Sequence, residues 1–104
     1  MNEIERLKKD KGSSVHILYC PACGWMLRAS WIAQEILSTF TNELESVVLE
    51  PAKENPGLFQ IWIGDDLIWC RKKDQGFPQV KDLKKRIRDR ICPKKDLGHL
   101  DRSD

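Results

Sequence analysis

The feature that most constrains the fold is a short apolar run that leads directly into two cysteines and then into a long helical pattern. The run Val15–Tyr19 is followed by Cys20-Pro21-Ala22-Cys23. A residue before proline is disfavoured in the α region, so we expect Cys20 to be extended. Pro21 suits the first position of a helix, because the amide hydrogen that it lacks would be unpaired there. The pattern therefore predicts a strand, then a helix that begins at Pro21.

The two cysteines are predicted to form a reversible dithiol–disulfide pair. With Cys20 as the N-cap and Cys23 in the first helical turn, their Cα atoms are expected about 5–6 Å apart, within disulfide range. Unpaired amides and the positive end of the helix dipole stabilise a thiolate there, which lowers the pKa of a cysteine. We expect Cys20 to be the more exposed thiol, with a pKa below that of a free thiol, and Cys23 to be partly covered by the helix.

Length and composition favour one small globular domain. The chain has 104 residues, of which 40% are hydrophobic and 33% charged, as in ordinary globular proteins. It has no apolar run long enough to span a membrane, and residues 1–10 lack the hydrophobic core of a signal peptide. We therefore expect a cytoplasmic protein. In a reducing compartment, a Cys-x-x-Cys pair indicates redox chemistry or metal binding rather than a structural disulfide.

Hydrophobic periodicity predicts the element order β-α-β-β-β-α. The expected strands are Ser14–Tyr19, Ser46–Leu49, Leu58–Ile63 and Leu67–Cys70, and the expected helices are Pro21–Phe40 and Gln79–Ile91. A right-handed parallel crossover followed by a hairpin gives a mixed four-stranded sheet. We predict an α/β fold, a two-layer thioredoxin-like domain over residues 14–92 with both helices on one face. Residues 1–13 are expected to be a flexible segment, and residues 93–104 a polar tail.

The third and fourth strands are predicted to pair through the two-residue loop Gly64-Asp65. The resulting opposite pairs are Trp62 with Leu67, Ile61 with Ile68, and Phe59 with Cys70. One face is then aliphatic, and we expect the helices to cover it (Phe59, Ile61, Ile63, Ile68 and Cys70). The open face would carry Gln60, Trp62, Leu67 and Trp69. Two tryptophans and a leucine in water suggest an interface, so we predict that the N-terminal segment or a homodimer covers Trp62, Leu67 and Trp69.

Each predicted helix has an apolar stripe. The stripe of the first helix is Met26, Ala29, Ala33, Ile36, Leu37 and Phe40, with Trp31 roughly opposite it, and that of the second is Val80, Leu83, Ile87 and Ile91. The segment 71–95 is strongly basic, including the helix Lys81–Arg90. It is interpreted mainly as a solvated helix face, with an acidic partner surface as the alternative. No aromatic residues are interleaved in this helix, which argues against nucleic-acid binding.

The remaining cysteines and histidines give weaker signals. Cys70 is predicted to be a small core residue, and Cys92 to lie at a helix end that disfavours a thiolate. His16 is interpreted as a structural histidine. Structural zinc needs four ligands, usually from two closely spaced pairs. A zinc site would need an unusual convergence of the cysteine pair with Cys70, Cys92, His16 or His99, so it stays a remote alternative.

Three sequence motifs resemble the selenoprotein W-like Rdx family. They are Tyr19-Cys20-Pro21-Ala22-Cys23-Gly24, Gly57-Leu58-Phe59-Gln60-Ile61-Trp62-Ile63 and Gln75-Gly76-Phe77-Pro78. The tail 97–102 is similar to the end of bacterial members, so the likeness covers about residues 14–102. The resemblance implies a thioredoxin-like fold and a thiol-redox role without a settled substrate. Members with selenocysteine carry it at the position of Cys23, where this chain has cysteine, so selenium-dependent reactivity is not implied.

The sequence thus predicts a small thiol–disulfide oxidoreductase or redox-sensing protein with Cys20 and Cys23 as its site. Thioredoxin geometry nominates Cys20 as the attacking thiol, whereas the family resemblance nominates Cys23, and of the two we favour Cys20. A redox-regulated protein-binding module without turnover is the alternative. No cofactor or metal is implied. The expected partner is a protein or small-molecule thiol or disulfide, with neither nucleic acid nor a membrane.

Overall fold

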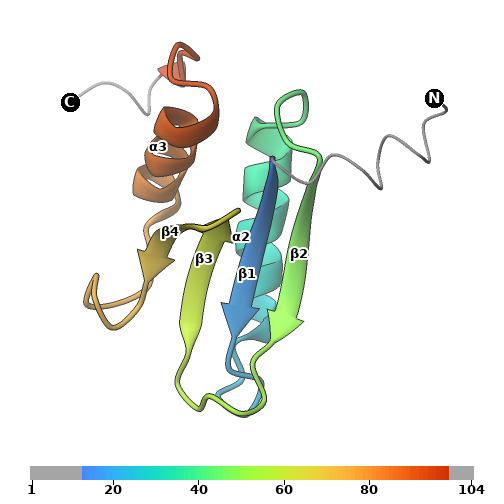
Figure 1. Ribbon diagram of the computed structural model, residues 1–104, viewed down its shortest axis with the longest axis vertical. Helices are drawn as coiled ribbons and strands as arrows, with labels where there is room; N and C mark the ends of the chain where they lie inside the picture. Colours follow the sequence, from blue (N-terminus) through green and yellow to red (C-terminus); the bar gives the residue numbers. More distant parts are fainter. Residues whose placement is uncertain (1–12, 99–104) are drawn as a thin grey trace, which may run out of the picture.

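The computed structural model describes residues 13–98 and has the predicted element order (Figure 1). The strands are β1 (Ser14–Tyr19), β2 (Ser46–Pro51), β3 (Phe59–Ile63) and β4 (Asp66–Cys70), and the helices are α2 (Met26–Thr39) and α3 (Val80–Ile91). The N-terminal segment 1–12 and His99, with the rest of the tail to 104, lie outside the described residues. Within residues 13–98, no helix has the length and apolar character needed to cross a membrane.

The four strands form one mixed sheet in the order β2-β1-β3-β4. β1 pairs in parallel with β2 and antiparallel with β3, which continues antiparallel into β4. Helix α2 makes the crossover between the two parallel strands and lies behind them in Figure 1. The segment after β1 and the loop between β2 and β3 lie at the same end of the sheet. This end therefore brings together residues that are far apart in the sequence.

Both helices cover the same face of the sheet, as predicted, and one core lies between the layers. Alternate residues of β1 and β3 point into it, and Ile61 is fully buried. The core cluster comprises Val15, Ile17, Tyr19, Ala29, Ile32, Ala33, Ile36, Phe40, Leu44, Phe59, Ile61, Ile63, Trp69, Leu83 and Ile87. Period-two burial in the strands and helical spacing in α2 and α3 account for the two layers.

The hairpin between β3 and β4 has the predicted loop but not the predicted register throughout. Ile63 pairs with Asp66 around Gly64-Asp65, and Gly64 takes the positive φ of 57° that such a turn requires. Trp62 pairs with Leu67, as expected. Beyond that pair, a β-bulge opposite Ile61 and Trp62 shifts the register by one residue.

This bulge overturns three predicted positions in β4. Ile61 pairs with Trp69 instead of Ile68, and Cys70 pairs with Gln60 instead of Phe59. The prediction that Trp69 lies on the open face is therefore wrong. Its side chain is 8% exposed, belongs to the core cluster, and donates a hydrogen bond from Nε1 to the Gly76 carbonyl. Cys70 instead lies on the side of Gln60, whose Nε2 approaches its Sγ at 3.8 Å.

The predicted stripe of the first helix is wrong at two positions and incomplete at a third. Met26 and Leu37 are exposed, whereas Ile32, which the stripe omits, is buried against the sheet. Trp31 points away from the core, as predicted, with 53% of its surface exposed. In α3, Leu83 and Ile87 are buried as expected.

Candidate functional site

The two cysteines of the motif lie in a turn between β1 and α2, which we call the cysteine loop (residues 20–25). Cys20 follows the last residue of β1 directly, and residues 21–24 form a turn. The amide of Gly24 donates a hydrogen bond of 3.1 Å to the carbonyl of Pro21. The central strand thus delivers one cysteine to the end of the sheet, and the turn folds the other back onto it.

The prediction that the helix begins at Pro21 is wrong, because α2 begins five residues later at Met26 with Trp25 as its N-cap. Gly24 has a φ of +74°, in the left-handed region, and a right-handed helix cannot continue through that conformation. The space around Gly24 would accept a Cβ, so the glycine is needed for its backbone conformation and not for packing. Cys20 is therefore not a helix N-cap, and Cys23 is not in the first helical turn.

The sulfur atoms of Cys20 and Cys23 are in contact, and their Cα atoms lie 5.4 Å apart. That Cα separation lies within the range that a disulfide bridges without backbone movement. Cys20 is 1% exposed, whereas Cys23 is exposed. The prediction that Cys20 is the more exposed thiol is therefore wrong, because Cys20 continues β1 into the core while the turn lifts Cys23 into solvent.

Three aromatic rings form a cluster that includes Trp25, the last residue of the cysteine loop. Trp25 packs edge-on against Phe77 at 4.9 Å and against Phe59 at 6.4 Å between ring centroids, and the two phenylalanines are 5.0 Å apart. Phe59 also pairs with Tyr19, the residue before Cys20. Sequence reasoning used Phe77 only as part of a family motif. Its loop position, beside glycine and proline, gave no periodicity that would have marked it as a packing residue.

Two arginines lie over this aromatic cluster. The guanidinium of Arg28 is 4.1 Å from the ring centroid of Phe77, and that of Arg71 is 5.0 Å from the ring of Trp25. Arg71 also donates from Nε and Nη2 to the carbonyl of Gly57, in the loop before β3. Cation–π contacts and these hydrogen bonds tie three segments together near the cysteine loop. The surroundings of the loop are thus aromatic and positively charged.

The loop that carries Phe77 is held in place by Asp74. One carboxylate oxygen accepts a hydrogen bond of 2.9 Å from the amide of Cys70, and the other accepts one of 3.1 Å from Arg86. The amide of Cys70, followed by the Arg86 guanidinium, lowers the pKa of Asp74. Arg86 also lies over the ring of Trp69 at 4.4 Å and donates to the carbonyl of Ile68. These contacts fix the bulged strand and the loop after it.

The lowered pKa of Asp74 predicts a pH-dependent contribution to stability. A carboxyl whose folded pKa lies below its unfolded value stabilises the fold above the unfolded pKa, about 3.9. That contribution is lost as the pH falls through the folded pKa. We expect Asp74→Asn to be less stable than wild type at pH 7, with a smaller difference at pH 3. Urea unfolding at both pH values measures this difference, and an equal or larger loss at pH 3 would contradict the assignment.

The other cysteines and the described histidine do not join the motif. Within residues 13–98, no group of three or more histidine, cysteine, aspartate or glutamate side chains is placed to hold a metal ion. Cys70 is buried, and its pKa is lowered chiefly by the backbone amide of Lys73. Burial raises the pKa of the half-buried Cys92, and the charge of Glu43 raises it further. Among the described residues, the alternative of a zinc site therefore lacks a set of ligands.

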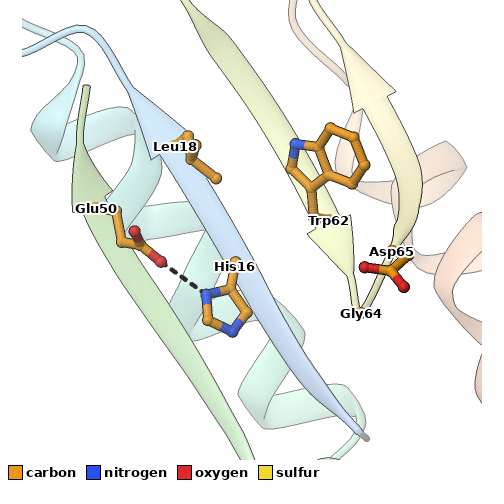
Figure 2. Close-up of a pocket in the computed structure, with 6 residues that line it drawn as sticks. All are labelled: His16, Leu18, Glu50, Trp62, Gly64 and Asp65. Carbon is orange, nitrogen blue, oxygen red and sulfur yellow. Dashed lines mark hydrogen bonds and ion pairs between the residues drawn. The ribbon is translucent and has the colours of Figure 1, made fainter. Parts of the chain in front are cut away.

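The open face of the sheet carries a shallow hollow, shown in Figure 2. His16 Nδ1 and Glu50 Oε1 form a hydrogen bond of 2.7 Å across β1 and β2. Leu18 and Trp62 flank this pair, and Gly64 and Asp65 close one end. Trp62 and Leu67 are half-buried, and the Trp62 Nε1 donates to Gln60. Trp69 does not belong to this face, so the predicted patch of two tryptophans and a leucine is reduced to Trp62 and Leu67.

The basic residues of α3 are largely engaged with carboxylates of the same chain. Lys84 pairs with Glu35 of α2 at 3.0 Å, and Arg90 pairs with Asp66 at the start of β4. With Arg86 on Asp74, these pairs connect α3 to its neighbours. The interpretation of this segment as a solvated helix face agrees with these contacts. Binding of this segment to an acidic surface of a partner remains a prediction.

Comparisons with known proteins give a consistent assignment. The profile of the Rdx family matches residues 14–89. Migration and invasion enhancer 1 of Mus musculus is 33% identical over 81 residues, which span 76% of this chain and 67% of that protein. A crystal structure from Bordetella parapertussis is 45% identical with a TM-score of 0.71, covering 75% of this chain and 96% of that one. The selenoprotein W-related protein of Vibrio cholerae is 46% identical with a TM-score of 0.71, covering 75% and 95%. The predicted thioredoxin-like α/β fold is confirmed.

Proposed function

The chain belongs to the Rdx family, and we propose that it is a thiol–disulfide oxidoreductase that works through Cys20 and Cys23. The observation that carries this proposal is the asymmetry of the pair, in which one sulfur is exposed and touches a buried one. An attacking thiol has to meet its substrate in solution, whereas a resolving thiol has to reach only its partner. We therefore assign the attack on the substrate disulfide to Cys23 and the resolution of the mixed disulfide to Cys20.

The proposed reaction proceeds in two exchange steps. The Cys23 thiolate attacks one sulfur of a substrate disulfide, forms a mixed disulfide with that sulfur, and expels the other sulfur as a thiolate. The Cys20 thiolate then attacks Cys23 Sγ, forms the intramolecular disulfide, and expels the reduced substrate. The protein loses two electrons and the substrate gains them. An external dithiol or two monothiols return the protein to its reduced form by the reverse sequence.

The surroundings of the loop support this chemistry. The nearest charged residue that follows the motif is Arg28, and Arg71 lies over the neighbouring Trp25. Positive charge close to a cysteine favours its thiolate form. The proposal needs no cofactor or metal, because sulfur exchange carries the electrons. We further propose that the protein works in the cytoplasm, where glutathione and thioredoxin keep thiols reduced.

Mild oxidation followed by peptide mapping tests the proposal. We expect the oxidised protein to carry a Cys20–Cys23 bond that glutathione reduces, with a reversible two-electron transition in a glutathione redox titration. The Cys70→Ser/Cys92→Ser variant is the matched control and is expected to give the same midpoint. If no Cys20–Cys23 bond forms, the proposal fails. If the bond forms but the protein does not turn over a disulfide substrate with excess thiol, the redox-regulated binding module replaces it.

A further inference from the structure

The large apolar side chains that are exposed within residues 13–98 all lie on α2. Met26 is 52% exposed, Leu27 77%, Trp31 53% and Leu37 41%. At about 100° per residue, these four positions lie within an arc of about 140° on the helix. Exposed leucines are ordinary one at a time, but a tryptophan grouped with three aliphatic residues is not. This arc faces away from the sheet, which takes Ala29, Ile32 and Ile36 from the opposite side of the helix.

Three of the four residues lie at the end of α2 next to the cysteine loop. Met26 is the first residue of the helix and stands three positions after the exposed Cys23. Trp31 lies about 7.5 Å further along the helix axis. We call Met26, Leu27 and Trp31 the α2 patch. Leu37 lies about 16 Å along the axis from Met26 and is outside this patch.

We propose that the α2 patch docks a polypeptide substrate whose cysteine is flanked by apolar and acidic residues, so that the substrate class is protein thiols or disulfides. This inference rests on the proposed function, because it extends the site of Cys23 by a binding surface. The patch begins three residues after Cys23, the only cysteine that is exposed among the described residues. A substrate strand that reaches Cys23 passes the start of α2, where its neighbouring side chains meet Met26 and Leu27.

The preference for an acidic residue in the substrate is inferred from a positive charge beside the α2 patch. Arg28 follows Leu27, and its guanidinium stacks on Phe77. Within residues 13–98 it is paired with no carboxylate. The acidic residue of α2, Glu35, is already neutralised by Lys84. The end of α2 near the cysteine loop therefore offers a cation without an opposing anion, which complements a carboxylate on the substrate.

The size of the patch favours a transient substrate over a second copy of this chain. Three side chains of which a half to three quarters is exposed offer on the order of a few hundred Å² of apolar surface. A stable protein interface needs about 800 Å² per partner. A small, largely apolar contact beside a reactive thiol fits an encounter that must end once the disulfide has exchanged.

Three synthetic peptides of equal length test the proposal, each with one cysteine activated as a thionitrobenzoate mixed disulfide. The first has leucine and aspartate around the cysteine, the second leucine and asparagine, and the third serine and glycine. The measurement is the single-turnover release of the coloured thiolate by the reduced full chain. We expect the first peptide to react about tenfold faster than the third and about threefold faster than the second.

Leu27→Gln/Trp31→Gln is expected to reduce the ratio of the first to the third peptide to about one, whereas the matched control Leu37→Gln keeps the ratio of wild type. A wild-type ratio near one, or a ratio that survives Leu27→Gln/Trp31→Gln, would overturn the docking proposal. Equal rates for the first and second peptides would overturn the part of the proposal that concerns an acidic residue in the substrate. Sedimentation that finds a dimer lost in Leu27→Gln/Trp31→Gln would overturn it in favour of a second copy. A wild-type chain that reacts with none of the peptides would instead refute the proposed function.

Discussion

Replacement of Cys23 by serine is expected to abolish disulfide exchange, with a loss of at least about 100-fold in the rate of attack on a model disulfide, because a hydroxyl without an activating base is a poor nucleophile. Cys20→Ser is expected to have a different effect. The exposed Cys23 still attacks, but it no longer has a neighbouring thiol to release the product. Because the thiol that contacts Cys23 has been removed, the variant accumulates as a stable mixed disulfide, which mass spectrometry of the intact protein detects.

The two variants also decide between the two assignments that the sequence left open. The thioredoxin comparison nominated Cys20 as the attacking thiol, and the family resemblance nominated Cys23. The burial of Cys20 and the exposure of Cys23 favour the second assignment. If Cys23→Ser accumulates as the mixed disulfide and Cys20→Ser loses the reaction, the order is reversed. Cys92→Ser is the control and is expected to react like wild type.

Phe59→Ala is expected to destabilise the fold by about 3–5 kcal/mol, as is usual for a buried phenylalanine. The side chain is 1% exposed and contacts both Trp25 and Phe77. Its removal leaves a cavity beside Trp25, the last residue of the cysteine loop. Urea unfolding of the reduced protein measures the loss as a fall in the midpoint without a change in m-value.

Phe77→Ala is the matched comparison for this prediction. Phe77 belongs to the same cluster, but it lies in a loop and is half-buried. Its truncation removes less apolar surface from the interior, so we expect a smaller loss than for Phe59→Ala. A loss below about 1 kcal/mol for Phe59→Ala, or a larger loss for Phe77→Ala, would contradict the view that Phe59 is the ring of the cluster that contributes most to the core.

The layers and the strand pairing were predictable because the sequence patterns there are local. Period-two alternation marked β1 and β3, and Gly64 marked the turn of the hairpin. The sequence also indicated Trp31 as a residue pointing away from the core. In each case one physical cause, side-chain burial or backbone conformation, acts over a few consecutive residues. Such a cause can be recognised without knowledge of the remaining chain.

The errors arose where two local signals competed. Pro21 is compatible with the start of a helix and equally compatible with a turn. The positive φ of Gly24 is compatible only with the turn. In β4, alternation placed Trp69 on the open face. The bulge is favoured by contacts with Gly76 and Arg86, which come from later in the chain. The exposures of Cys20 and Cys23 followed from the misplaced helix start, so one backbone conformation accounts for both errors at the site.

The central position of β1 has a practical consequence for handling this protein. Ser14 begins that strand and Cys20 directly follows its last residue, about 20 Å from Ser14 at the rise of an extended chain. Anything joined ahead of Ser14, whether an affinity tag, a fluorophore or a surface anchor, enters the fold at the end remote from the cysteine loop (Figure 1). The cysteine loop and the start of α2 follow the other end of β1.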